Sequence, residues 1–117
     1  MEHITSHKVN GLNDAITISA LDGPGAGGAC HHYRLASEEF CFELRFQNGP
    51  IKEAGVNGLS NEAILAVVEH RLLGFQSSEF ACRENQEALN KLQEAMMWLH
   101  KRTRERVTRG VEGTNVP

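Results

Sequence analysis

The stretch that decides the fold is NEAILAVVEHRLLGFQSSEFACRENQEALNKLQEAMMWLHKRTRERV, residues 61–107. Its first part predicts a helix that begins at Ser60 or Asn61, because either side chain can accept a hydrogen bond from the first turn. Apolar residues then recur at helical spacing along one stripe: Ile64, Leu65, Val68, Leu72 and Phe75. Gly74 and residues 76–81 indicate a turn after this helix.

A second helix is predicted from about residue 83 to about residue 106. Its apolar residues alternate three and four positions apart, which is typical of a packed seam: Leu89, Leu92, Met96 and Leu99. Glu87 and Lys91 have the spacing of a favourable surface pair. Two helices joined by a short turn form an antiparallel hairpin.

The residues before this hairpin predict strands. Residues 14–22, DAITISALD, alternate apolar and polar side chains, and Tyr33 and Leu35 indicate a second short strand. In a third strand one face carries Phe40, Phe42, Leu44 and Phe46, and the other carries Cys41, Glu43, Arg45 and Gln47. This apolar sheet face needs a cover, and we expect the helices to supply it. Residues 1–13 are polar and are predicted to form a loose arm.

The fold class is therefore α+β, with a small N-terminal antiparallel β-sheet packed with a C-terminal antiparallel two-helix hairpin. We expect a single domain over residues 1–117, because 117 residues with 40% hydrophobic side chains suit one domain of ordinary size. Its parts are a β-rich part (1–47), a loop (48–60), the helical hairpin (61–107) and a tail (108–117). The core is modest, so we expect self-association to add stability.

Charge is concentrated near the end of the second helix. The chain has 12 Lys and Arg against 15 Asp and Glu, a net charge of -3. Five cations lie there: Lys101, Arg102, Arg104, Arg106 and Arg109. Only Glu105 opposes them, so this stretch carries a net charge of +4 and the rest of the chain carries -7. Such a distribution argues against long nucleic acids and favours a small anionic ligand. From the residues alone we favour a solvated helix end whose cations complement the helix dipole over a ligand site.

The sequence shows no signal for membrane insertion or secretion. No apolar run approaches the roughly 20 residues that span a bilayer, so no membrane partner is expected. The beginning, MEHITSHKVNG, lacks the apolar region of a secretory signal. Three widely spaced cysteines, Cys30, Cys41 and Cys82, fit reduced thiols in a cytoplasm better than a disulfide framework.

Motifs for metal or catalysis are weak. The loop GPGAGG, residues 23–28, lacks the Lys-Ser/Thr ending of a phosphate-binding loop, so a flexible hairpin connection is favoured. Cys30, His31 and His32 lack a second ligand pair at zinc-finger spacing, and we expect no metal and no other cofactor. Three Cys and six His offer too many nominal dyads to single one out, and no GxSxG or HExxH string occurs. The sequence does not predict an enzyme.

Two regions have the chemistry to bind a nucleotide. The loop NGPIKEAGVNGLS, residues 48–60, delivers backbone N–H groups to a helix start and adds the cation of Lys52; the alternative is a simple helix cap after a crossover. At the inter-helix turn, Phe75 and Phe80 could stack on a base and Asn85 could bond to a base edge. For Phe80 we favour a role in closing the hairpin.

Three segments carry a family resemblance: QNGPIKEAGVNGLSNEAIL, HRLLGFQSSEFACREN and RTRERVTRGVEGT. Together they resemble the helical hairpin shared by two phage anti-defence sponge families, the first Thoeris anti-defence family and the second anti-CBASS family. This resemblance covers residues 47–114. The preceding ALDGPGAGGACHHYRL and the Phe-rich strand resemble the β-rich half found only in the Thoeris family.

The resemblance implies a function that periodicity alone does not reach. Members of the Thoeris family bind and sequester cyclic ADP-ribose isomers made by TIR-domain enzymes, without cleaving them, in the cytoplasm of the bacterial host. Some members also bind cyclic di- or trinucleotides at a separate site, formed when dimers assemble into hexamers. The alternatives are an enzyme that degrades the same signals and a helical-hairpin adaptor that binds a protein.

The resemblance also implies site residues. Phe75 would stack on the adenine, Asn85 would hydrogen-bond to the ligand, and arginines would face the diphosphate: Arg102, Arg106 and, as a third, Arg109. The loop before the hairpin would close the pocket through Asn48, Ile51 and Lys52. The cyclic-oligonucleotide site would use Arg109, Gly113 and Thr114.

Helix geometry adds a requirement to this assignment. Asn85 and Arg102 are 17 residues apart in the sequence, which is about 25 Å along one helix. One small ligand cannot contact both in the same subunit. If both bind it, the Asn85 end of one helix meets the Arg102 end of another, as in an antiparallel homodimer.

Overall fold

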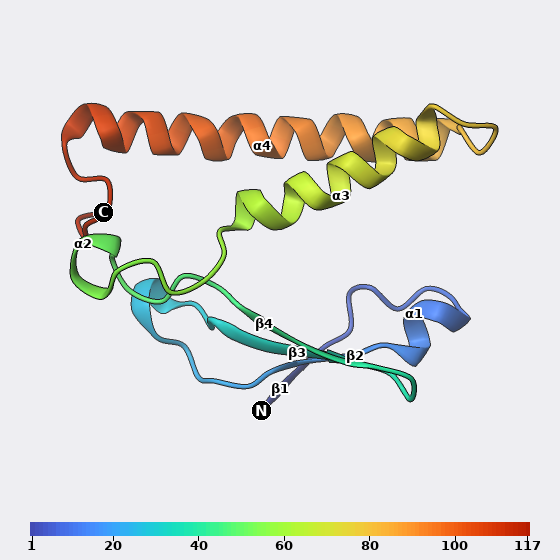
Figure 1. The fold of residues 1–117 in the computed structure, drawn as a ribbon, viewed down its shortest axis with the longest axis horizontal. Helices are drawn as coiled ribbons and strands as arrows, with labels where there is room; N and C mark the ends of the chain where they lie inside the picture. Colours follow the sequence, from blue (N-terminus) through green and yellow to red (C-terminus); the bar gives the residue numbers. More distant parts are fainter. The chain divides into compact units, whose positions relative to one another are not determined.

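The computed structural model describes residues 1–117 and divides into two compact units, residues 1–58 with Pro117 and residues 59–116 (Figure 1). The first unit holds an antiparallel sheet and the second holds a helical hairpin, so the predicted α+β class is confirmed. The single domain, and the covering of the sheet by the helices, stay predictions. None of the helices is both long and apolar enough to cross a membrane.

The sheet has four antiparallel strands in sequence order: β1 (Glu2–Ile4), β2 (Thr17–Ala20), β3 (His32–Ala36) and β4 (Cys41–Arg45). Its register aligns Ile18 with Leu35 and Leu35 with Phe42, and the next row on the same face aligns Ala20, Tyr33 and Leu44. The three strands predicted from alternation are thus confirmed, with shorter bounds. Apolar side chains share one face because side chains alternate with a period of two.

The prediction of a loose arm over residues 1–13 is wrong. Glu2–Ile4 pairs with β2 as the edge strand β1, and a short helix follows, α1 (Gly11–Ala15). Asn10 caps that helix, its Oδ1 accepting from the Asn13 N–H at 2.9 Å. His7 Nε2 donates to the Ile16 carbonyl at 2.7 Å. The polar composition misled because an edge strand is held by main-chain hydrogen bonds, which any side chain permits.

The connection between β2 and β3 is held by one carboxylate. It contains the 3₁₀ turn η1 (Ala26–Gly28), where Gly27 has a positive φ of 71°. The Asp22 carboxylate accepts hydrogen bonds from the backbone N–H groups of His31, at 2.9 and 3.2 Å, and of His32, at 3.2 Å. The glycine-rich loop is therefore a hairpin connection, as predicted.

These bonds make the sheet sensitive to acid. The hydrogen bond from the His31 N–H has the largest effect on the Asp22 carboxyl and lowers its pKa. Burial opposes this effect, and the His32 N–H lowers the pKa further. A lowered pKa stabilises the fold above the unfolded-state pKa of about 4. That stabilisation is lost as the pH falls through the folded-state pKa.

We predict that Asp22→Asn lowers the Tm at pH 7 and flattens its decline below about pH 4. The measurement is thermal unfolding followed by circular dichroism from pH 7 to pH 2. Asp14→Asn, at an exposed carboxylate, is the matched control and should leave the profile unchanged. A wild-type pH profile in the Asp22 variant would contradict this account.

The segment between sheet and hairpin is an ordered loop, as predicted, but it contains the short helix α2 (Ile51–Ala54), which was not predicted. Asn57 organises the loop: its Oδ1 accepts from Asn48 N at 2.8 Å and its Nδ2 donates to Asn48 O at 2.7 Å. Gly58 is required beside Phe46, because a Cβ there would lie 2.4 Å from the Phe46 carbonyl carbon.

The hairpin consists of α3 (Asn61–Gln76) and α4 (Arg83–Arg109), which lie antiparallel in Figure 1 and confirm the prediction. Ser60 caps α3, its Oγ accepting from Ala63 N at 3.1 Å. The turn begins later than predicted, because α3 continues through Gly74. A helical glycine costs only about 1 kcal/mol. The stop comes from Gln76, whose side chain bonds to both the N–H and the carbonyl of Cys82.

A seam of alternating spacing joins the two helices. The least exposed side chains of α4 follow each other four and three residues apart: Asn85, Leu89, Leu92, Met96, Leu99, Thr103 and Arg106. The predicted apolar seam from Leu89 to Leu99 is thus confirmed, and a polar residue extends it at each end. On α3 only part of the predicted stripe is covered: Leu65 and Leu72 are half-buried, whereas Val68 and Phe75 stay 42% and 37% exposed.

One predicted surface pair is replaced by another. Glu87 and Lys91 form no ion pair, and the i,i+4 pair on α4 is instead Lys101 with Glu105, at 2.9 Å. Its hydrogen bond and charge lower the pKa of the Glu105 carboxyl.

Candidate functional site

The five cations near the end of α4 separate into two environments. Lys101, Arg102, Arg104 and Arg109 are exposed, whereas Arg106 is only 7% exposed. A shallow hollow of about 520 Å³ lies on the outer face of this helix end, lined by Lys101, Arg104, Glu105, Thr108 and Arg109. Among the exposed cations Lys101 pairs with Glu105 at 2.9 Å, and the buried Arg106 has a different set of partners.

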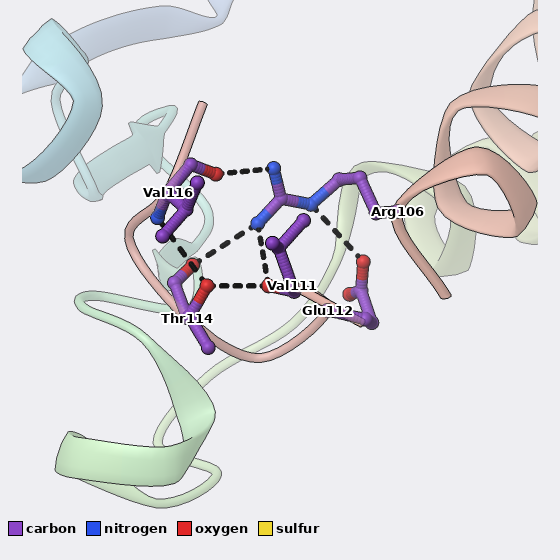
Figure 2. Close-up of polar contacts among 5 residues, drawn as sticks. All are labelled: Arg106, Val111, Glu112, Thr114 and Val116. Carbon is purple, nitrogen blue, oxygen red and sulfur yellow. Dashed lines mark hydrogen bonds and ion pairs between the residues drawn. The ribbon is translucent and has the colours of Figure 1, made fainter. Parts of the chain in front are cut away.

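Arg106 holds the tail (Figure 2). Its Nε donates to the Glu112 carboxylate at 3.1 Å, and its Nη1 donates to Val116 O at 2.6 Å. Its Nη2 donates to Val111 O at 3.0 Å and to Thr114 O at 3.1 Å. The tail, which has no helical or strand periodicity, is thus ordered by wrapping one guanidinium.

The arrangement uses most of the donors of Arg106. A guanidinium has five N–H groups, and four of them face the tail, which leaves one N–H on Nη1. The predicted contact of Arg106 with a diphosphate therefore has a single donor to work with unless the tail moves. Arg102 is exposed on the same helix and forms no hydrogen bond or ion pair within the chain.

Sequence reasoning missed the structural role of Arg106, although a signal was present. Continuing the alternation of three and four from Leu99 leads through Thr103 to Arg106, a seam position that should be covered. An arginine there must find acceptors, because a buried unpaired charge is costly. The carbonyls of the following turn supply them.

We predict that Arg106→Ala lowers the free energy of unfolding by about 2–4 kcal/mol, since it leaves a carboxylate and three carbonyls without their donor. The matched control Arg102→Ala removes the same charge from an exposed position and should cost within about 0.5 kcal/mol. Urea unfolding measured by circular dichroism compares the two. Equal losses in both variants would show that the tail contacts carry no stability.

The opposite end of the hairpin brings Phe75 and Asn85 to either side of the inter-helix turn. Phe75 lies in the last turn of α3, and the guanidinium of Arg71 lies 5.1 Å from the centre of its ring. Asn85 lies in the first turn of α4, where its backbone N–H donates to the Cys82 sulfur at 3.4 Å and its side-chain amide forms no hydrogen bond within the chain. An aromatic ring and an open amide therefore flank one turn.

The prediction that Phe80 closes the hairpin is wrong. Its side chain is 66% exposed at the tip of the turn. Ser78 organises the tip instead, its Oγ accepting from Phe80 N at 3.1 Å and donating to Phe75 O at 2.7 Å. The turn thus closes through polar contacts.

The other predicted residues lie in two different parts of the chain. Asn48, Ile51 and Lys52 belong to the first unit, where Ile51 and Lys52 begin α2 and are exposed. Gly113 and Thr114 lie in the tail, and Thr114 joins directly to Arg106 through its carbonyl. The structure therefore brings together two residues that were assigned to separate ligands, Arg106 and Thr114.

The cysteine and histidine run serves the β2–β3 connection. The Cys30 thiol donates to the Asp22 carbonyl at 3.3 Å, and burial followed by the nearby Asp22 charge raises the pKa of that thiol. His31 Nε2 donates to Ala26 O at 2.9 Å, and His32 Nε2 lies 3.2 Å from the Glu43 carboxylate. No three of the chain's His, Cys, Asp or Glu side chains are grouped to hold a metal ion.

Asn85 and Arg102 lie on the same helix, because α4 runs without interruption from Arg83 to Arg109. Within one chain they are therefore about 25 Å apart. These features define an α+β protein whose helical hairpin carries an aromatic ring and an amide at one end and a cluster of cations at the other.

Comparison with known proteins identifies the family. The family model described as the Acb2/Tad1 hairpin domain matches residues 42–104, and the chain belongs to this family. It is also 58% identical over 94 residues to Thoeris anti-defense 1 of Bacillus phage SBSphiJ7, which covers 78% of this chain. The chain spans 65% of the length of that relative. The aligned stretch is longer than residues 42–104, so the similarity extends beyond the hairpin.

Proposed function

We propose that this protein is a phage anti-defence protein that inhibits Thoeris immunity by binding cyclic ADP-ribose isomers and holding them intact in the host bacterial cytoplasm. Membership of the hairpin family and the similarity to a Thoeris anti-defence protein support this proposal. The observation that carries it is the division of chemistry along α4. A group suited to a base lies at one end of an unbroken helix, and groups suited to phosphates lie at the other.

A ligand that uses both ends requires two copies of the chain. We propose an antiparallel homodimer in which Phe75 and Asn85 of one subunit face Arg102 of the other, with Arg106 and Arg109 nearby. The charge distribution along α4 supports an antiparallel arrangement of the two copies. The first half of α4 carries three carboxylates and two cations, whereas its last turns carry five cations and one carboxylate.

The surface of the hairpin supports association as well. Apart from Arg106, only Leu89 is buried in this unit, and many large apolar side chains are exposed along its two helices: Val67, Val68, Leu73, Phe75, Met97, Trp98 and Val107. Exposed apolar groups in such number favour burial against another copy. A hexamer built from three dimers, with cyclic di- or trinucleotides bound near Arg109, Gly113 and Thr114, is the larger assembly that we propose.

Sequestration rather than cleavage follows from the side chains assigned to the ligand. Phenylalanine has no ionisable group, asparagine is a neutral amide, and arginine stays protonated at physiological pH. None of them serves as a general base or a nucleophile in ordinary catalysis. These residue types at the two ends of the hairpin therefore support binding without turnover, and Lys52 is the one other ionisable side chain assigned to the ligand.

The direct test is to mix the protein with the cyclic ADP-ribose isomers produced by a TIR-domain enzyme, filter away unbound ligand, denature the retained protein by heat and analyse the release by mass spectrometry. We expect ligand of unchanged mass. A changed mass would make the protein an enzyme, and no retained ligand would overturn cyclic ADP-ribose as the signal. The same assay with cyclic oligonucleotides then tests the second ligand class.

We predict that Phe75→Ala and Arg102→Ala each weaken cyclic ADP-ribose binding by about 5- to 100-fold, because base stacking and a charge-assisted hydrogen bond each contribute about 1–3 kcal/mol. Isothermal titration calorimetry measures the loss, and size-exclusion chromatography checks that the oligomer persists. Phe80→Ala is the matched aromatic control and should bind normally. Unchanged titrations for both site variants would remove this pocket assignment.

A further inference from the structure

The side chain of Arg71 contacts Phe75, the proposed base-stacking residue. Its guanidinium carbon lies 5.1 Å from the centre of the Phe75 ring. The two residues are four positions apart on α3, so their side chains are neighbours on one helix face. Long helical side chains lean toward the N-terminus of their helix, which places the Phe75 ring over the turn that carries Arg71.

The Arg71 guanidinium keeps its hydrogen-bonding capacity. The side chain is exposed and forms no hydrogen bond or ion pair with the rest of the chain. The contact with Phe75 places the guanidinium carbon 5.1 Å from the ring centre, and a cation–π contact of this kind consumes none of the five N–H donors. A cation with open donors therefore stands beside an aromatic ring that is itself accessible.

Arg71 differs from two other cations of the hairpin in its partners. Glu105 neutralises Lys101, and the tail surrounds Arg106. Arg71 lies at the base-stacking end, far along the hairpin from the basic end of α4. A mononucleotide unit offers a base and an anionic oxygen close to each other, and this is the chemistry that a ring and a guanidinium side by side accommodate.

We propose that Arg71 and Phe75 form one subsite for a nucleotide unit, in which the ring stacks on the base and the guanidinium binds a phosphate oxygen of the same ligand. The proposal rests on the proposed function, because it takes Phe75 as the base-stacking residue. It adds a cation to the end of the pocket where sequence reasoning placed only an aromatic ring and an amide. The phosphates would then be held from both subunits of the dimer rather than from one.

The test uses the full-length protein and the cyclic ADP-ribose isomers made by a TIR-domain enzyme. Arg71→Met keeps a long apolar stem and removes the charge and the donors. We expect it to raise the Kd at least about tenfold, the loss of a charge-assisted hydrogen bond. Lys91→Met, which removes one exposed cation from the middle of α4, is the matched control and should stay within about twofold of the wild type.

Two further measurements separate direct contact from a structural effect. Raising the salt concentration weakens the wild type by screening its charges, so a direct contact predicts a smaller salt effect in Arg71→Met. Arg71→Lys restores the charge without the planar fork and should recover part of the affinity. A weaker Arg71→Met with an unchanged salt response and no recovery in Arg71→Lys would overturn the proposed contact.

The result for Phe75→Ala distinguishes this proposal from the one on which it rests. If Phe75→Ala weakens binding and Arg71→Met does not, the subsite is wrong while the proposed function stands. If neither variant changes the Kd, the assignment of Phe75 to the base fails, and the subsite fails with it. Loss of affinity in both, with wild-type circular dichroism and Tm, is the outcome that supports the subsite.

Discussion

The structure of the hairpin depends on the alternation of three and four residues along α4. This spacing keeps one line of side chains facing inward over the full length of the helix, from Asn85 to Arg106. It decides that Leu89 is covered and that Arg102 is not. Because the line is straight and α4 is unbroken, it also separates the two chemical ends of the hairpin by a fixed length.

The inward-facing side chains of α4 have different roles in the middle of the helix and at its two ends. The middle is apolar, from Leu89 to Met96, and holds α3 against α4. Each end is polar, with Asn85 beside the inter-helix turn and Arg106 inside the tail. Stability and ligand chemistry therefore share one register without sharing residues, except at Arg106. At that position a single guanidinium is committed mostly to structure, so in the proposed site the phosphates fall mainly to Arg102.

Sequence patterns predicted the elements whose side chains decide their position. The strand containing Phe42 and Leu44 and the seam around Leu89 were predicted because their apolar side chains recur with the period of a strand or of a helix. Patterns failed where main-chain or single side-chain contacts decide. β1 forms through backbone pairing alone, and α3 passes Gly74 because Gln76 bonds across to Cys82.

The candidate site likewise has features that the sequence predicts and features that it does not. The placement of Phe75 and Asn85 beside the turn could be predicted, because both positions follow from the helix boundaries. The contacts of individual side chains could not be predicted. Neither the guanidinium of Arg71 over Phe75 nor the carbonyls around Arg106 produce a periodic pattern in the sequence. Such contacts depend on rotamers and on the path of a nonperiodic segment, which a linear pattern does not encode.

The tail around Arg106 has a consequence for how its sequence can vary. Three of the four acceptors are main-chain carbonyls, those of Val111, Thr114 and Val116. Carbonyl groups are supplied by every amino acid, so the contacts with Arg106 do not depend on the side chains of Val111 and Val116. Thr114 differs, because its Oγ1 also donates to Val111 O and accepts from Val116 N. What must be kept is the path: the left-handed turns at Gly110 and Gly113, and the number of residues between them. Substitution of Val111 or Val116 should therefore be tolerated where insertion or deletion in the tail is not.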